Sequence, residues 1–306
     1  MDCWHHLRNI WFGAVIDHLS KTLDDILVDD LKNIPSVLRV NTGVVSLLRA
    51  CEKMFAKTAM YSKGDTVVFE SWMKTYHTNA YLFPLARACG GSRQDLGVEG
   101  APAVLWNIKY YVPYLHWRLT CGARDNILRQ NLFILLRSVE VIALLRVLSI
   151  LYYSICLPVR WLSGNTVNTG AEGFAALNMG IVLDLMEDAF INISRDGQLL
   201  LDEYFMMNIF SSIEEKLPSF ATFLKHMFEE MVGTIPESND RVIPGNLIRA
   251  ELFYPQRKEI RQTHKIAVRL AEEAAAVFLV EFRDLSIFAE AFAGASALEP
   301  AVGSLG

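Results

Sequence analysis

The sequence has few cysteines, and their spacing fits neither a metal site nor a redox motif. The five cysteines of the 306-residue chain each lie more than thirty residues from the next. They are Cys3, Cys51, Cys89, Cys121 and Cys156. Scattered cysteines in a large chain are typical of small buried side chains in a reducing compartment. The first residues, MDCWHHLRNIWFG, also lack the positive-then-apolar pattern of a secretion signal. Both absences predict an intracellular, cytoplasmic protein.

The sequence also lacks any run of five or more charges of one sign. Its 29 Lys and Arg residues face 34 Asp and Glu residues, so the formal net charge is only −5. Proteins that bind nucleic acid carry a basic patch or stripe that contacts the phosphates. The charge pattern therefore predicts no nucleic-acid partner.

The usual catalytic motifs are missing as well. The sequence contains no G-x-S-x-G elbow, no P-loop, no dinucleotide fingerprint and no H-E-x-x-H pair of histidines. These motifs carry the residues of nucleophilic catalysis, nucleotide binding and zinc hydrolysis. We therefore predict no catalytic residues and favour a non-enzymatic role.

Long apolar stretches, in contrast, are abundant, and hydrophobic residues make up 52% of the chain. The longest stretch is 131–158, NLFILLRSVEVIALLRVLSILYYSICLP, which has no Gly or Pro before Pro158. A buried strand would end after about 4 to 8 residues, so this stretch predicts a helix, and Pro158 ends it. No segment alternates convincingly as a strand would. The sequence predicts an all-α fold, an irregular multi-helix bundle around one long central apolar helix at about 126–158.

One stretch, 89–102, has the composition of a linker between domains. It contains four glycines and a proline in fourteen residues, CGGSRQDLGVEGAP. We expect an N-terminal helical region at 1–88 and a main helical domain at 103–293, with a single domain as the alternative. The small residues of 294–306 predict a disordered tail.

The central helix also allows a membrane hypothesis. Its window 141–159 contains a single charge, Arg146, and its apolar residues offset the cost of about 2.5 to 3.5 kcal/mol for an arginine at mid-bilayer. The charge-free run 147–159 is, however, shorter than the 18 or more residues of a usual span. We favour a buried helix, and a membrane-associated protein with a single span near 141–159 is the alternative.

Two acidic clusters suggest an enzyme as a further alternative. Four aspartates in LDDILVDDL resemble the aspartate-rich helical motif with which isoprenoid synthases hold magnesium and diphosphate. They are Asp24, Asp25, Asp29 and Asp30. Under this resemblance, Asp184, Glu187 and Asp188 would form the second cluster across a cavity. An acidic helix face in water is the simpler interpretation, so a metal-dependent helical enzyme ranks below the other hypotheses.

The most specific pattern is NISRDGQLLLDE, at 192–203. Oxygen-bearing side chains occupy its positions 1, 3, 5 and 12, glycine is at 6 and an aliphatic residue is at 8, so it resembles the calcium loop of an EF-hand. The resemblance implies calcium ligands at Asn192, Ser194, Asp196 and Glu203, a turn at Gly197 and a backbone carbonyl donor at Gln198. Asn at position 1, the cationic Arg195 and Leu200 at position 9 depart from the pattern. They predict weak binding, on the order of 10 µM to 1 mM.

EF-hands usually occur in pairs, and 240–251 is the candidate partner loop. It has Gly245 and Glu251 at positions 6 and 12, but Val242 and Pro244 stand where ligands belong. This loop is expected to pair without holding calcium. The favoured hypothesis is a non-catalytic interaction or regulatory protein that binds an unidentified protein partner and has one weak calcium loop.

Overall fold

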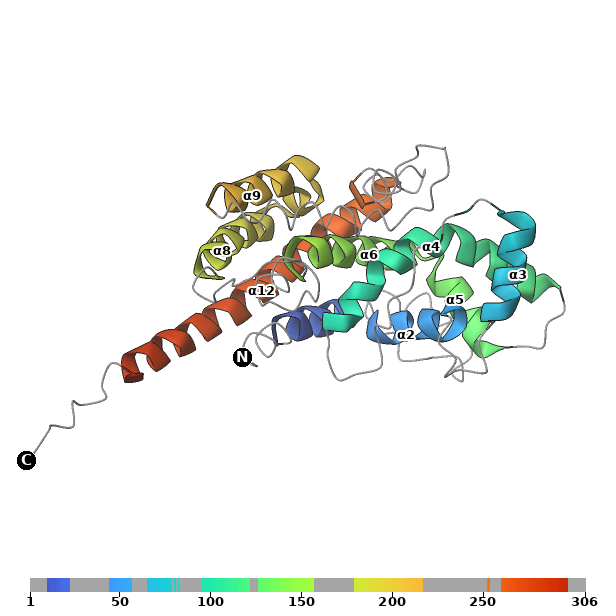
Figure 1. Cartoon of the computed structure of the whole chain (residues 1–306), viewed down its shortest axis with the longest axis horizontal. Helices are drawn as coiled ribbons and strands as arrows, with labels where there is room; N and C mark the ends of the chain where they lie inside the picture. The colour runs from blue at the N-terminus through green and yellow to red at the C-terminus, as the bar shows by residue number, and fades with distance from the viewer. Residues whose placement is uncertain are drawn as a thin grey trace, which may run out of the picture.

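Every regular element that the structure describes is a helix, which confirms the predicted all-α class (Figure 1). The computed structural model describes residues 10–22, 44–56, 65–78, 80, 82, 95–121, 126–156, 179–216, 252–253 and 260–296. In chain order the elements are an N-terminal helix at 10–22, α2 (Val44–Phe55), α3 (Thr66–Tyr76), α4 (Asp95–Thr120), α5 (Ile127–Leu135), α6 (Val139–Leu151), the π-helical turn η2 (Tyr152–Cys156), α8 (Met179–Arg195), the 3-10 turn η4 (Gly197–Leu201), α9 (Glu203–Lys216) and α12 (Ile260–Ser296).

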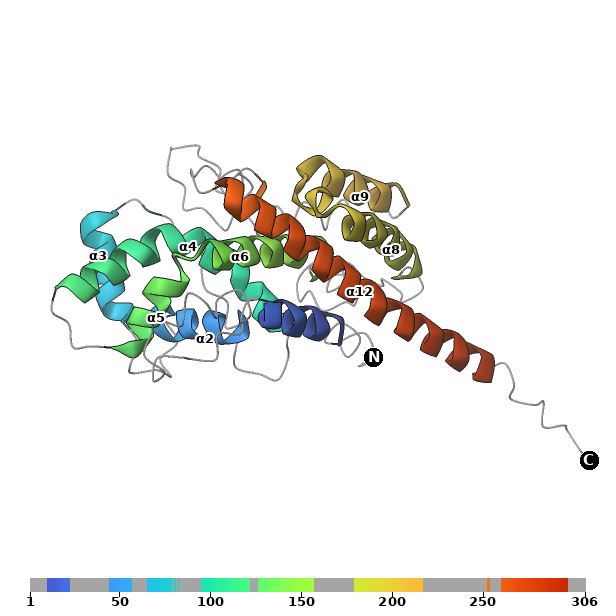
Figure 2. The ribbon, with the colours of Figure 1, turned by 180° about the vertical axis from the view of Figure 1, so that it is seen from behind.

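Helix α6 lies at the centre of the molecule, between α4 and α12 (Figures 1 and 2). Residues 143–156, which form most of α6 and all of η2, are buried without interruption. A helix that is apolar all round has to be covered on every side, because no face of it gains from contact with water. The predicted central position of this apolar segment is therefore confirmed.

The central segment is nevertheless divided, where the sequence predicted one continuous helix at about 126–158. Helix α5 ends at Leu135, and α6 starts at Val139 after a short turn. The cause is Ser138, whose side chain accepts a hydrogen bond from the Val141 amide at 3.4 Å and so caps a new helix. Ser138 also contacts the Glu140 carboxylate in the first turn. A polar cap thus interrupts an apolar run without help from glycine or proline.

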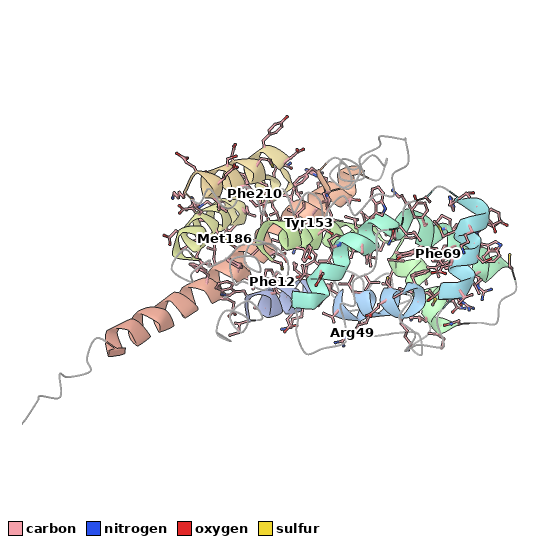
Figure 3. The ribbon with its side chains drawn as sticks, in the orientation of Figure 1. Phe12, Arg49, Phe69, Tyr153, Met186 and Phe210 are labelled. Carbon is pink, nitrogen blue, oxygen red and sulfur yellow. The ribbon has the colours of Figure 1, made fainter. Side chains whose placement is uncertain are left out.

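On one side of α6, aromatic side chains fill the space between α2, α3 and α4. The rings of Phe55 and Tyr111 stack with centroids 3.8 Å apart, and Phe69, which is labelled in Figure 3, meets Tyr114 edge to face at 5.0 Å. Tyr111 and Tyr114 are buried. The aromatic segment of α4 therefore forms part of the core.

The second half of the predicted linker, from Asp95 onward, is helical. Helix α4 begins at Asp95, and Val98 and Ala101 are buried within it. One continuous cluster of buried side chains includes residues of the N-terminal helix, α2, α4, α6 and α12. The helix is favoured here because packing against the core outweighs the low helix propensity of its glycines. Among the described residues the buried cluster thus extends over both proposed regions, and the division at 89–102 stays a prediction.

The N-terminal helix packs against α12, although the two are far apart in the sequence. Trp11 lies 5.4 Å from Phe278 between ring centroids, and Glu273 accepts a hydrogen bond from Thr22 at 3.1 Å and pairs with His18 at 3.3 Å. Beyond these contacts, the C-terminal part of α12 extends away from the other described helices (Figures 1 and 2). Because α12 continues to Ser296, the first residues of the predicted tail are helical.

Candidate functional site at the junction of α6, η4 and α12

The segment predicted to bind calcium lies between two helices, as an EF-hand loop does. Helix α8 precedes it, α9 follows it, and the middle of the segment forms the 3-10 turn η4. Glu203 is the first residue of α9 and is buried. The order helix, turn, helix thus agrees with the sequence pattern.

The first two predicted ligands, Asn192 and Ser194, lie within a helix and not in an open loop, because α8 continues to Arg195. Asn192 donates from Nδ2 to the Asp188 carbonyl at 3.0 Å, and the Ser194 hydroxyl donates to the Ile191 carbonyl at 2.9 Å. Both side chains therefore bond to the backbone of their own helix. Calcium coordination by these residues requires the last turn of α8 to open.

The remaining positions of the segment stabilise the turn. Asp196 accepts the Gln198 amide on Oδ1 at 3.0 Å and so caps η4. No group of three or more acidic, histidine or cysteine side chains within the described ranges is arranged to hold a metal ion. Calcium binding at 192–203 stays a prediction.

Gly197 has a second reason to be glycine, which the sequence did not reveal. A Cβ atom on Gly197 would lie 2.1 Å from the Val268 carbonyl oxygen and 2.8 Å from Cγ of Glu272. The Gly197 amide donates to Glu272 Oε1 at 3.2 Å. The backbone of η4 therefore lies directly against α12, and only glycine allows this approach without displacement.

Arg146 is the buried charge at the centre of the molecule, and only 1% of it is exposed. Its Nη2 donates to the Phe253 carbonyl at 2.8 Å, and its Nε donates to the Leu252 carbonyl. Burial lowers the pKa of Arg146 to about 10. The guanidinium stays charged at neutral pH and donates hydrogen bonds to both carbonyl groups.

His264 of α12 connects this arginine to η4. Its Nδ1 lies 3.3 Å from Nη1 of Arg146, and its Nε2 bonds to the Gln198 side-chain oxygen. Burial and then the Arg146 charge lower the pKa of His264 below its ordinary value of 6.5. Arg146, His264 and Gln198, which we call the junction triad, thus join α6, α12 and η4 in one polar chain.

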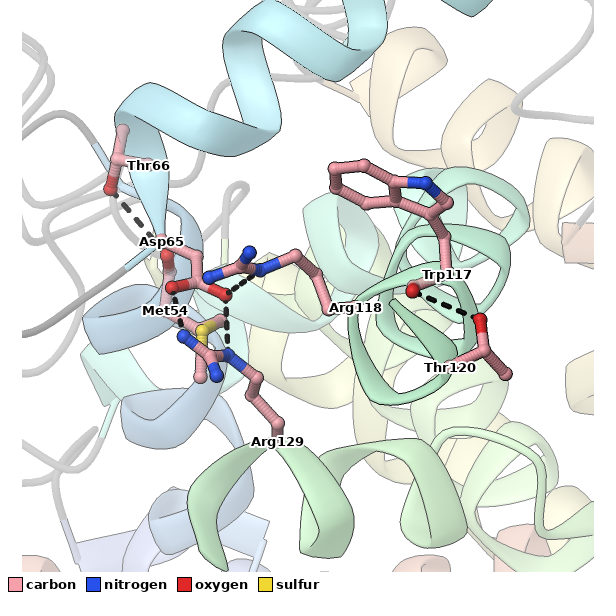
Figure 4. A network of polar contacts seen from close by, with 7 residues as sticks. All are labelled: Met54, Asp65, Thr66, Trp117, Arg118, Thr120 and Arg129. Atoms are coloured by element: carbon pink, nitrogen blue, oxygen red, sulfur yellow. Dashed lines mark hydrogen bonds and ion pairs between the residues drawn. The ribbon is translucent and has the colours of Figure 1, made fainter. Parts of the chain in front are cut away.

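A second buried ion network holds the opposite end of the molecule together (Figure 4). Asp65 binds Arg129 through two hydrogen bonds of 2.6 Å and Arg118 through one of 3.2 Å. Burial alone would raise the pKa of Asp65, but hydrogen bonds and charge from Arg129 and then Arg118 lower it below 3.8. All three charged groups are used in joining α3, α4 and α5.

The acidic clusters are placed only in part. Asp24, Asp25, Asp29 and Asp30 lie outside the described residues, as does the candidate partner loop at 240–251. On α8, Asp184 and Asp188 are exposed. The isoprenoid-synthase hypothesis stays a prediction.

The chain matches no family model, no curated protein and no solved structure.

Proposed function

We propose that this chain is a non-catalytic helical protein that binds a protein partner, and that residues 192–203 form its calcium-responsive element. One observation carries the proposal: the middle of the predicted loop packs directly on α12, through the backbone of Gly197 and the side chain of Gln198. Any change in the loop therefore alters a contact of the longest helix.

Calcium would act by changing which groups the loop residues bind. Asn192 and Ser194 have to exchange their bonds within α8 for the ion, and Glu203 has to present its carboxylate from the start of α9. Opening the last turn of α8 displaces η4, which follows it directly. The junction triad then transmits this displacement to α12 and α6.

Calorimetry on the full chain tests calcium binding. We expect heat with a dissociation constant on the order of 10 µM to 1 mM, little response to magnesium, and no calcium binding by Glu203→Gln, which lacks the bidentate anion. Glu215→Gln is the matched control, because Glu215 is exposed on the same helix. Identical titrations for wild type and Glu203→Gln, or no heat at millimolar calcium, would remove the calcium element from the proposal.

Affinity purification tests the partner separately. Wild type and Glu203→Gln are compared in calcium and in chelator. A protein retained only by wild type in calcium supports a calcium-controlled interaction. A protein retained in all four conditions supports the interaction and refutes its control by calcium.

Membrane association through the central segment is the alternative proposal. Residues Val139–Cys156 form a helix long and apolar enough to cross a membrane, the feature that favours it. However, 83% of that window is buried inside the protein, and Arg146 at its centre binds carbonyl groups of the same chain. Core packing already accounts for its apolar character, so this proposal ranks second.

A further inference from the structure

The hydroxyl group of Thr22 joins the N-terminal helix to α12, and the two helices lie side by side in both views (Figures 1 and 2). This hydroxyl donates to Oε2 of Glu273 at 3.1 Å and also lies 3.2 Å from the carbonyl oxygen of His18 in its own helix. An ionised carboxylate and a carbonyl oxygen only accept hydrogen bonds, so the hydroxyl is the donor in both contacts. The hydrogen bond between the two helices at this point therefore depends on the single hydrogen of the Thr22 hydroxyl group.

One arginine of α12 balances the charge of Glu273. Nε of Arg269 donates to Oε1 of Glu273 at 2.9 Å, and Nε2 of His18 lies 3.3 Å from Oε2. The Glu273 side chain is 23% exposed, so salt and water screen its charge only in part. A further anion beside Glu273 would therefore be repelled by the carboxylate.

The sequence after Thr22 is acidic at two positions that matter for modification. Asp24 and Asp25 stand two and three residues after it, and they enter here through the sequence alone, because they lie outside the described residues. Acidophilic protein kinases select such side chains through a basic substrate groove. Thr22 itself is half-buried, beside the exposed Lys21, so it lies at the edge of the helix contact.

We propose that Thr22 is a phosphorylation site for an acidophilic protein kinase, and that its phosphorylation releases the N-terminal helix from α12. Oγ of Thr22 attacks the γ-phosphorus of ATP, the new Oγ–P bond forms, and the bond from that phosphorus to the bridging oxygen breaks to release ADP. The hydroxyl proton passes to the catalytic base of the kinase. The phosphate ester then carries a charge of about −1.5 to −2 at pH 7. The hydrogen that Thr22 donated to Glu273 is gone, and two anionic groups face each other.

Release of the helix would uncover aromatic side chains. Trp11 is 2% exposed, and its ring centroid lies 5.4 Å from that of Phe278 and 5.9 Å from that of Phe282. Phosphorylation thus converts a buried aromatic contact into an accessible apolar surface. This switch acts through the N-terminal helix and does not depend on calcium at 192–203.

Kinase treatment of the purified full chain tests the site. The chain is incubated with ATP and a kinase of the casein-kinase type, and the product is mapped by mass spectrometry. We expect phosphate on Thr22 of wild type, and less of it when Asp24→Asn and Asp25→Asn are combined. Absence of phosphate on Thr22, or equal modification of the combined variant, would overturn the proposal.

Hydrogen exchange at neutral pH tests the release. Protection of the amides of residues 14–20 should fall by about tenfold after phosphorylation, because like charges at short range repel strongly near a protein surface. The amides of α6 should keep their protection. Unchanged protection at 14–20, or an equal loss in α6, would contradict a local release of the N-terminal helix.

The variant Glu273→Gln shows whether repulsion causes the release. Its neutral amide donates to the phosphate in place of repelling it. We expect phosphorylation to lower the protection of residues 14–20 by less than about twofold in this variant, whereas a loss equal to that of wild type would overturn the proposal.

Thr22→Ala is the matched control for phosphorylation elsewhere in the chain. It keeps Ser212, which has Glu214 and Glu215 at the same two following positions and whose hydroxyl donates to the Asn208 carbonyl of its own helix. Kinase treatment of Thr22→Ala should leave the protection of its N-terminal helix unchanged from the untreated variant. A fall on treatment would show that another site causes the release.

Discussion

At the scale of a single residue, Gly197 shows how closely η4 and α12 approach. A methyl group at this position meets the backbone carbonyl of Val268, which has no flexible end to move aside. We expect Gly197→Ala to lower the free energy of unfolding by about 3 kcal/mol, the upper end of the usual cost of overpacking. Urea denaturation measures this. Ser211→Ala on the exposed face of α9 is the control, with a change within about 0.5 kcal/mol. An equally small change for Gly197→Ala would contradict the close approach.

Arg146 supports a second prediction at this scale. Replacing it with methionine keeps the apolar stem but removes the donors to the carbonyl group of buried Leu252 and to that of partly buried Phe253. Each unpaired buried acceptor costs about 1 to 3 kcal/mol, and relief of the buried charge offsets part of this. We expect a loss of roughly 2 to 4 kcal/mol in thermal or urea unfolding. Arg137→Met is the control at an exposed arginine, and it should change the free energy of unfolding by less than about 0.5 kcal/mol. Equal losses in the two variants would show that burial of Arg146 contributes nothing to stability.

At the scale of elements, Asp65 joins four helices. Its amide donates to the Met54 carbonyl at the end of α2, it precedes α3, and its carboxylate binds Arg118 of α4 and Arg129 of α5. Asp65→Asn leaves both arginines without their anion. We expect Asp65→Asn to lower the free energy of unfolding by roughly 3 kcal/mol at pH 7. The control Asp184→Asn, on the exposed face of α8, should leave this free energy almost unchanged.

The same network predicts the acid dependence of stability. The pKa of Asp65 is lowered in the folded state. Its contribution to the free energy of unfolding is therefore complete above about pH 3.8 and is lost as the pH falls through the folded-state pKa. The stability difference between wild type and Asp65→Asn should therefore shrink below pH 3.8. Denaturation curves between pH 2 and 7 measure it. A constant difference over this range would show that the Asp65 carboxylate does not titrate with the fold.

The elements also show what the sequence could and could not predict. The apolar run of α6 is sufficient to place it in the core. Ser138, with Glu140 in the first turn, is a helix start signal that the prediction of one continuous helix did not use. The partners of Arg146 are backbone carbonyl groups 106 and 107 residues away. Because every residue has a backbone carbonyl group, the sequence does not indicate which of them bind Arg146. The pattern predicts a turn at Gly197, whereas the contact of Gly197 with α12 depends on tertiary packing, which the pattern does not contain.

At the scale of the whole molecule, the location of the α6 and η2 segment gives a prediction about membranes. Its side chains contact α4 and α12, so the folded chain has little of this surface left for lipid. We expect alkaline carbonate to extract the expressed chain into the supernatant, beside a single-span control protein that stays in the pellet. Retention of the chain with the control would favour the membrane alternative.

The contact between the N-terminal helix and α12 has a consequence for biosynthesis. Thr22 and Glu273 are 251 positions apart, and the Trp11 ring packs against Phe278 and Phe282 of α12. A ribosome adding about 5 to 20 residues per second needs roughly 13 to 50 seconds to make the intervening chain. During that interval Trp11 lacks its native contacts with Phe278 and Phe282. We therefore expect the N-terminal helix to reach its native packing only after α12 has emerged from the ribosome.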